Sequence, residues 1–285
     1  MTGDRQMIES PFHFETGAAS HTGCVRNHNE DRFLARPESG LWLVADGMGG
    51  HQAGDFASQT IADAAASVGI PSSALDLQAR FMDRLTTAHH EIKAHSTRLG
   101  GATVGATLVA LLIYDLNCAC IWAGDSRIYL LREGHFRQVT VDHTEVQELL
   151  RTGAITPEQA KTWPRRNVIT RAIGVFDQPA NDEARGDVNE GDTFLLCSDG
   201  LTEHVEDAEM AGILSRNSAQ DSCNQLIDLT LERGARDNVT VLVVRCLRRS
   251  AFAPYSGQSK SNAPTLPGLG PGTVCGQPHQ IRMAQ

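Results

Sequence analysis

Long hydrophobic runs are missing from this chain of 285 residues, since no segment approaches the roughly 18 apolar residues that a membrane-spanning helix needs. The first eleven residues, Met1 to Pro11, are polar and lack the apolar core of an export signal. Basic clusters are no longer than pairs such as Arg248-Arg249, and the net charge is −9. We therefore expect a soluble, cytoplasmic protein with no membrane insertion and no nucleic-acid partner.

The cysteines also lack a metal-binding or redox spacing. The seven residues, at positions 24, 118, 120, 197, 223, 246 and 275, contain no C-x-x-C pair, and most lie inside apolar runs. This pattern favours reduced core thiols over disulfides, as in a cytoplasmic protein.

Composition and local pattern divide the chain into three parts. We expect an N-terminal extension at 1–11, one domain at 12–248 and a tail at 249–285. With 41% hydrophobic and 21% charged residues, the chain can bury a full core. Residues 250–285 contain ten Gly or Pro and only two charged side chains, Lys260 and Arg282, so we expect a disordered Gly/Pro-rich tail.

Within the domain, strand patterns cluster with strand patterns and helix patterns come in pairs. The expected strands are 12–21, 32–35, 41–45, 105–114, 117–123, 128–132, 136–140, 193–198 and 239–246, with a hairpin turn at 133–135. The expected helices are 55–68, 75–99, 207–215 and 219–233, and a polar, helix-leaning insertion covers 144–175. This order favours an α+β fold, with two antiparallel sheets covered by helices, over alternating βαβ units.

Acidic residues stand where these strands are expected to end or begin, at Asp46-Gly47, Asp125, Asp199-Gly200 and Asp237-Asn238. The glycines would let the backbone turn sharply and expose the preceding carbonyl as a ligand. If the strand ends converge, the carboxylates would repel one another unless cations lie between them. An all-oxygen ligand set suits magnesium, manganese or calcium better than zinc.

A further turn adds a guanidinium to this acidic set, because Arg26 is followed by Glu30 and Asp31. An arginine beside a metal cluster can hold two phosphate oxygens in its planar fork while the cations neutralise the rest. Arg26 is therefore a candidate for both catalysis and substrate binding.

Seven motifs now follow one another in an order that resembles the type 2C, metal-dependent protein serine/threonine phosphatases. They are Val25-Arg26-x-x-Asn29-Glu30-Asp31, Ala45-Asp46-Gly-Met-Gly-Gly-His51, Gly105-Ala-Thr-Leu108, Gly124-Asp125-Ser-Arg127, Asp142-His-Thr144, Cys197-Ser-Asp199-Gly-Leu201 and Asp237-Asn-Val-Thr240. The match covers roughly residues 14 to 246. Three segments are similar in sequence to the bacterial single-domain branch of this family, namely 46–51, 153–157 and 167–174. Members of that branch are partners of membrane-bound serine/threonine kinases.

The resemblance implies a central antiparallel β-sandwich flanked by helix pairs, in four layers (αββα), with two Mn²⁺ or Mg²⁺ ions at one end. It implies that Asp46 bridges both ions, that the Gly47 carbonyl completes one site, and that Asp199 and Asp237 hold the other ion. Glu30 and Asp31 would act mainly through metal-bound water. Asp125, with Asp199, matches a third and weaker metal site.

The implied function is a monomeric phosphoprotein phosphatase that opposes a bacterial serine/threonine kinase by hydrolysing phosphoserine and phosphothreonine. A hydroxide bridging the two ions would attack phosphorus in line, so no protein nucleophile is needed. Consistently, no cysteine is followed six positions later by arginine, and neither a G-N-H-E signature nor a P-loop occurs.

One departure from the family and two further functions stay open. Animal members place a histidine after the Asp-Gly where this chain has Met48, so the proton donor is either His51 or metal-bound water. The insertion at 144–175 corresponds to the family's flap, in which Arg165 and Arg166 would steer an acidic phosphoprotein. The other functions are a pseudophosphatase that only binds partners, although no metal aspartate is missing, and a phosphatase of small phosphate esters.

Overall fold

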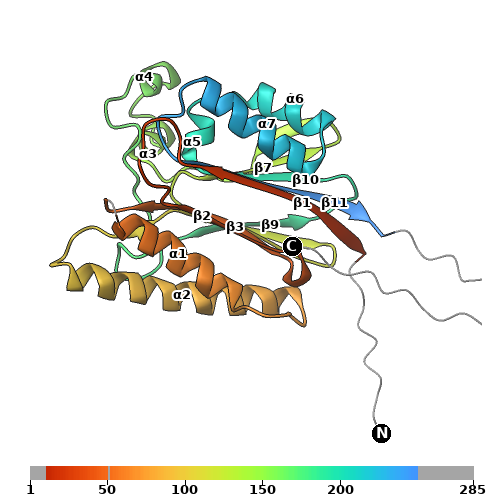
Figure 1. The fold of residues 1–285 in the computed structure, drawn as a ribbon, viewed down its shortest axis with the longest axis horizontal. Coiled ribbons are helices and arrows are strands. Elements are labelled where there is room, and N and C mark those ends of the chain that lie inside the picture. Colours follow the sequence, from red (N-terminus) through yellow and green to blue (C-terminus); the bar gives the residue numbers. More distant parts are fainter. Residues whose placement is uncertain (1–10, 51, 250–285) are drawn as a thin grey trace, which may run out of the picture. The chain divides into compact units, whose positions relative to one another are not determined.

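The computed structural model describes residues 11–50 and 52–249, where two antiparallel sheets lie face to face and helices cover both outer faces (Figure 1). These four layers confirm the expected α+β sandwich. The expected N-terminal extension and tail lie, apart from Pro11 and Arg249, outside the described residues and stay predictions. In the described part of the chain, every helix is too short or too polar to cross a membrane.

The first sheet has the strand order β1-β11-β10-β7-β8. Its strands are β1 Phe12–His21, β11 Val239–Arg248, β10 Thr193–Cys197, β7 Arg127–Arg132 and β8 His135–Gln138. The second sheet has the order β2-β3-β5-β6-β9, with β4 paired to β3. Its strands are β2 Asp31–Arg36, β3 Leu41–Met48, β5 Leu108–Tyr114, β6 Asn117–Ala123, β9 Asp182–Asp187 and β4 Gly105–Ala106.

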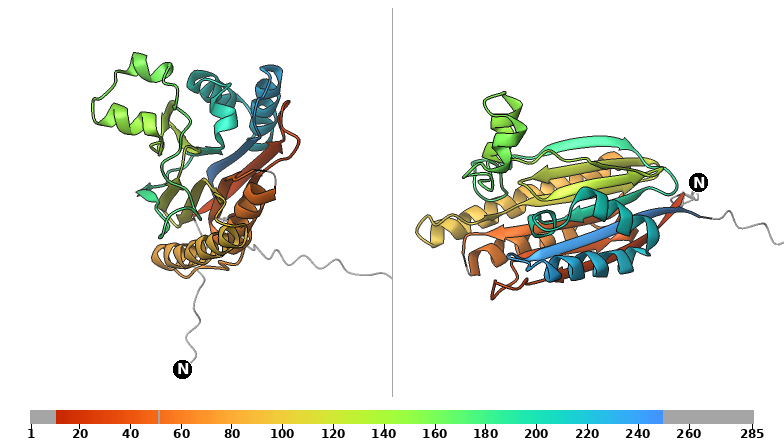
Figure 2. Two further views of the ribbon diagram at one scale, coloured as in Figure 1. Left: turned by 90° about the vertical axis from the view of Figure 1, so that its left-hand side faces the viewer. Right: turned by 90° about the horizontal axis from the view of Figure 1, so that it is seen from above.

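Helices α1 Gln52–Ala66 and α2 Ala74–Arg98 cover the second sheet, and α5 Asp199–Thr202, α6 Asp207–Arg216 and α7 Ala219–Glu232 cover the first. Two short helices, α3 Glu145–Arg151 and α4 Pro157–Lys161, belong to the insertion and stand away from the sandwich (Figure 2). A 3₁₀ turn spans Pro37–Ser39.

The sequence of β3 shows how the layers are held together. Leu41 and Leu43 point to the core shared with α1 and α2, whereas Trp42 and Val44 point to the core between the two sheets. Successive side chains of a strand face opposite sides, so a strand buried on both faces is apolar throughout. A third core, around Leu195 and Leu226, joins the first sheet to α5, α6 and α7.

Serine caps explain where two of the long helices begin. The Ser73 hydroxyl accepts from the Asp76 N–H at the start of α2, and the Ser218 hydroxyl accepts from the Asp221 N–H at the start of α7. Each bond satisfies one of the backbone donors that a helix N-terminus leaves unpaired.

Most of the expected elements are present, with five main differences. The strand expected at 105–114 is divided at Thr107 into β4 and β5. β3 runs on through Asp46-Gly47 to Met48, because Gly47 and Met48 pair with β4. Asp199 opens helix α5 rather than a turn. The 133–135 turn is shorter than expected, since His135 belongs to β8 and only Glu133 and Gly134 have positive φ. The polar strand β9 has no hydrophobic pattern and forms by pairing with β6.

Candidate metal centre and active site

Asp46 lies near the end of β3, held by contacts with Thr107, the residue between β4 and β5. The Asp46 N–H donates to the Thr107 hydroxyl at 3.1 Å, and the Asp46 carbonyl accepts from the Thr107 N–H at 2.8 Å. The same hydroxyl lies 2.8 Å from that of Ser126, the residue after Asp125. Thr107 therefore ties the backbone of Asp46 to the loop that carries Asp125.

The two glycines that follow the aspartates serve close packing rather than a sharp turn, which corrects the expectation from the sequence. Neither Gly47 nor Gly200 has a positive φ. A Cβ on Gly47 would lie 2.2 Å from the Gly54 carbonyl oxygen of α1, and a Cβ on Gly200 would lie 2.0 Å from the Asn238 carbonyl oxygen. Because real Cβ atoms do not come this close to backbone, only glycine lets these segments meet.

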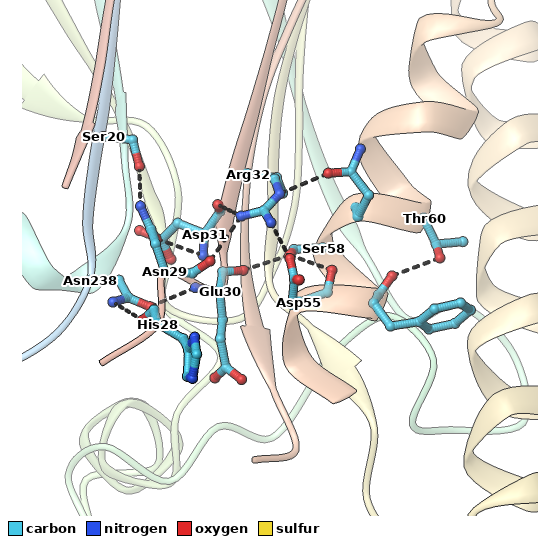
Figure 3. A network of polar contacts seen from close by, with 12 residues as sticks. Ser20, His28, Asn29, Glu30, Asp31, Arg32, Asp55, Ser58, Thr60 and Asn238 are labelled. Carbon is cyan, nitrogen blue, oxygen red and sulfur yellow. Dashed lines mark hydrogen bonds and ion pairs between the residues drawn. The ribbon is translucent and has the colours of Figure 1, made fainter. Parts of the chain in front are cut away.

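Asn238 organises the loop that carries Arg26 and Glu30, and Figure 3 shows its contacts with His28 and Glu30. Its amide nitrogen donates to the carbonyls of Thr22 at 2.9 Å and His28 at 2.8 Å, and its amide oxygen accepts from the Glu30 N–H at 2.8 Å. One side chain directly before β11 thus fixes both ends of a loop more than 200 residues earlier in the chain.

Arg32 clamps the next part of this loop to helix α1 (Figure 3). Its guanidinium donates to the backbone carbonyls of Asn29 at 2.9 Å and Asp31 at 2.7 Å, and it also contacts Asp55 and Gln59 of α1. The Glu30 carbonyl accepts from the Ser58 hydroxyl at 2.5 Å. The segment 29–31 is consequently bound on one side by β11 and on the other by α1.

Asp31 pairs across the sheet with Asp46, so β2 and β3 bring two carboxylates side by side. Asp31 is almost fully buried, and its Oδ2 accepts from the Ser198 hydroxyl at 2.8 Å. Ser198 immediately precedes Asp199, and its hydroxyl accepts from the Thr240 N–H at 3.0 Å. These bonds join the carboxylates of the second sheet to those of the first.

Arg26 forms an ion pair with Asp237, the residue before Asn238, at 2.6 Å between Nη2 and Oδ2. Both side chains are accessible, at 56% and 34% of their surface. The pair brings the expected phosphate-binding guanidinium beside one of the expected metal ligands.

The loop of Asp125 is fixed by two residues that directly precede the insertion, Asp142 and His143. The Gly124 N–H donates to His143 Nδ1 at 3.2 Å, and the Gly124 carbonyl accepts from the His143 N–H at 2.8 Å. Arg127 forms a bidentate ion pair with Asp142, with contacts of 2.7–3.1 Å. Two of the motifs noted in the sequence, 124–127 and 142–144, are therefore one structural unit.

The carboxylates perturb one another strongly. Burial, and then the charges of Asp31, Asp199, Asp125 and Asp237, raise the pKa of Asp46 well above its ordinary value. Burial followed by the charge of Asp125 does the same for Asp199. Burial is also the main cause that raises the pKa of Asp31 and of Asp125 to about 6. Like charges this close, in a site withdrawn from water, are the condition under which a cation is favoured.

The donor set fits divalent cations that prefer oxygen. One carboxylate oxygen of Asp31 and one of Asp199 are buried without a hydrogen-bond partner among the described residues. An unpartnered buried carboxylate oxygen is costly unless an ion or water binds it. Within residues 11–50 and 52–249, no three acidic, imidazole or thiol groups lie close enough to form a ready-made ligand cage. The carboxylates are nevertheless near enough to raise one another's pKa.

Seven of the residues expected from the sequence therefore meet at one end of the sandwich. They are Arg26, Glu30, Asp31, Asp46, Asp125, Asp199 and Asp237. Gly47 adjoins them, because its N–H donates to the Glu30 carbonyl at 3.2 Å. Arg165 and Arg166 lie instead in the insertion, where Arg165 pairs with Glu145 at 2.9 Å and Arg166 contacts the Lys161 carbonyl at 3.4 Å. His51 lies outside the described residues.

Several supporting residues were not expected from the sequence. Thr107, Ser198 and Asn238 all stand inside the quoted motifs, and Ser198 and Asn238 adjoin Asp199 and Asp237, which was the available signal. For Arg32 the sequence contained no such signal, because its role depends on the position of α1.

An αββα sandwich with buried carboxylates and an adjoining guanidinium at one end has the groups that a metal-dependent phosphatase needs. Residues 15–239 match the family model described as "Protein phosphatase 2C". The chain belongs to the protein phosphatase 2C family.

Relatives support this assignment over most of the domain. The chain is 37% identical over 231 residues to the serine/threonine phosphatase stp of Listeria innocua, a match that covers 78% of this chain and 92% of the relative. The structure of PppA, a regulatory component of T6SS in Pseudomonas aeruginosa, is 41% identical with a TM-score of 0.77, over 82% of this chain and 98% of the other. The catalytic domain of PstP in complex with two manganese ions is 34% identical with a TM-score of 0.73, over 83% and 99%.

Proposed function

We propose that this protein phosphatase removes phosphate from phosphoserine and phosphothreonine in proteins, using two central divalent cations. The observation that carries the proposal is the convergence of buried, mutually repelling aspartates beside Arg26, on a fold shared with a manganese-bound serine/threonine phosphatase. In this proposal Asp46 and the Gly47 carbonyl would hold one ion, and Asp46, Asp199 and Asp237 would hold the other. Glu30 and Asp31 would orient water at the site.

When bound, the ions supply Lewis-acid catalysis and lower the pKa of water, which then provides the nucleophile. The chain's own residues bind and orient the substrate. Arg26 holds two phosphate oxygens through its planar fork. Its present partner, Asp237, is exposed enough for that exchange. Arg165 and Arg166 are proposed to attract acidic segments of the phosphoprotein, since both lie on the outward-standing insertion.

The biological setting is proposed more coarsely. The phosphatase would oppose a serine/threonine kinase, act as a monomer and work in the cytoplasm. The last point is supported by the cysteines, since the six in the described residues are free thiols.

Metal removal tests the central proposal. The full chain, treated with a chelator, should lose turnover of a phosphothreonine peptide, and manganese should restore it. Magnesium in a parallel series shows which ion supports the faster reaction. Lack of turnover with every metal would leave the binding-only alternative, and turnover of small phosphate esters without peptides would favour the third function.

Asp125 is proposed to hold a third, weaker ion together with Asp199. We expect Asp125→Ala to lower peptide turnover while calorimetry still shows two tightly bound manganese ions per chain. The reason is that Asp125 is the largest charge acting on Asp199, whereas on Asp46 it ranks after Asp31 and Asp199. Loss of one of the tight ions would place Asp125 in the central site instead.

The proton donor is either His51 or solvent, and two substrates distinguish them. A serine alkoxide is a poor leaving group that benefits from an acid, whereas nitrophenolate leaves without one. If His51→Gln slows hydrolysis of a phosphoserine peptide but not of p-nitrophenyl phosphate, His51 is the acid. Equal losses on both substrates would give His51 a supporting role, and no loss on either would leave solvent as the acid.

A further inference from the structure

A buried histidine joins helix α2 to the segment that follows the insertion. His89 has no exposed surface. Its Nδ1 lies 3.0 Å from the Gly174 N–H nitrogen, and its Nε2 lies 3.0 Å from the Phe176 carbonyl oxygen. Because the backbone N–H can only donate and the carbonyl can only accept, both bonds form only with the neutral imidazole that carries its proton on Nε2.

The segment 172–176 is seated closely against this helix. Gly174 has φ +91°, and a Cβ there would lie 2.2 Å from Ile92 Cγ2 of α2. Lys93, one turn after His89, forms an ion pair with Asp177 at 2.9 Å. The helix therefore holds the segment by shape, by an ion pair and by both nitrogens of His89.

The other side of the segment adjoins the strands of the metal centre. Ile173, which is fully buried, exchanges two backbone hydrogen bonds with Ala106 of β4, at 3.1 and 2.9 Å. Ala106 in turn pairs with Gly47 of β3. A continuous series of contacts thus runs from His89 through Ile173 and β4 to the backbone beside Asp46.

We propose that His89 is a positioning residue, whose neutral imidazole fixes the return of the insertion, residues 172–176, and through β4 the backbone at Gly47. No contact with substrate is involved. The link to catalysis rests on the proposed phosphatase function, whereas the link to the order of residues 172–176 does not.

Gaining a second proton on the His89 ring would disrupt this arrangement. Burial lowers the pKa of His89, and this outweighs the hydrogen bond to the Phe176 carbonyl, which raises it; the neighbouring His90 and Lys93 lower it further, while Asp177, the residue after the segment, is paired with Lys93. A proton on Nδ1 would face the Gly174 N–H and break that bond. Since the folded pKa is below the unfolded one, the stabilisation is present above the ordinary histidine pKa and is lost as the pH falls through the lowered value.

Hydrogen exchange of the metal-free full chain tests the structural part. His89→Phe keeps the ring but removes both bonds, and exchange of residues 172–176 should rise about 10- to 100-fold, with β10 and β11 unchanged. His89→Asn, whose Oδ1 can accept from Gly174, should keep most of the protection and lose its dependence on acidic pH. His90→Phe, at the exposed neighbouring position, is the matched control. Unchanged exchange in His89→Phe, or an equal rise throughout the sheets, would overturn the proposal.

Kinetics with manganese and a phosphothreonine peptide test the catalytic part. We expect kcat/KM to fall about tenfold in His89→Phe, to recover to within about threefold in His89→Asn, and to stay unchanged in His90→Phe. Equal activity of all the variants would overturn the link to Gly47. A parent chain without activity would instead refute the proposed function and leave the exchange result standing.

Discussion

Asp46→Asn should abolish peptide turnover while the domain stays folded. Asp46 is the one carboxylate proposed to hold both central ions, and it is the residue whose pKa is raised by the charges of four other aspartates. Losing the ligand shared by both ions should remove several kcal/mol of transition-state stabilisation, or at least about 10³-fold in rate. The rate of phosphothreonine peptide hydrolysis in saturating manganese measures this loss.

Asp46→Asn should affect thermal stability differently from activity. In the absence of metal, the Asp46 carboxylate is buried among like charges, so a neutral amide should leave the melting temperature in chelator unchanged or higher. Asp63→Asn, on the exposed face of α1, is the matched control and should keep full activity. Normal manganese-dependent turnover in Asp46→Asn would refute the metal assignment, and a lower melting temperature would show that Asp46 is needed for folding.

Arg26→Ala should raise KM for a phosphopeptide by about one to two orders of magnitude and affect kcat less. A bidentate, charge-assisted contact to phosphate typically contributes about 1.5–3 kcal/mol, which corresponds to that range. Steady-state kinetics on one peptide give both constants. Arg26→Lys, which keeps the charge but not the planar fork, should fall between the parent and the alanine variant.

The ion pair of Arg26 with Asp237 requires a control, because removing the arginine also releases a proposed ligand. Arg236→Ala removes a neighbouring exposed arginine and should leave KM unchanged. If KM also stays unchanged in Arg26→Ala, the arginine has a structural role at Asp237 and the phosphate assignment is wrong.

The acidic residues of the site could be predicted from the sequence, but the contacts that hold them in place could not. Asp46 and Asp199 could be predicted because each follows a strongly apolar strand pattern, which is a local signal. The continuation of β3 past Asp46 could not, because it depends on pairing with Gly105-Ala106, far along the chain. The sequence predicted turns at Gly47 and Gly200, but both glycines instead allow close contact with backbone, from Gly54 of α1 and from Asn238 directly before β11.

The same difference between local and long-range signals applies to whole strands and to single supporting residues. β9 was not expected, because a strand with the sequence Asp182-Glu-Ala-Arg-Gly-Asp187 is fixed by its partner β6 rather than by its own hydrophobicity. His89 could not be separated from an ordinary core residue, since its function depends on a segment more than 80 residues later. Arg32 is similar, because its four partners come from two separate elements.

The position of β11 determines when the enzyme can complete its fold during synthesis. This last strand lies between β1, the first, and β10, so the first sheet is split until residues 239–248 are available. Asp237 and Asn238 arrive with it, and Asn238 is what holds the loop of Arg26 and Glu30. A growing chain therefore carries most of its catalytic groups early but cannot assemble them. Pairing between such distant segments is slow to form, so activity should appear only after the last strand has left the ribosome and closed the sheet.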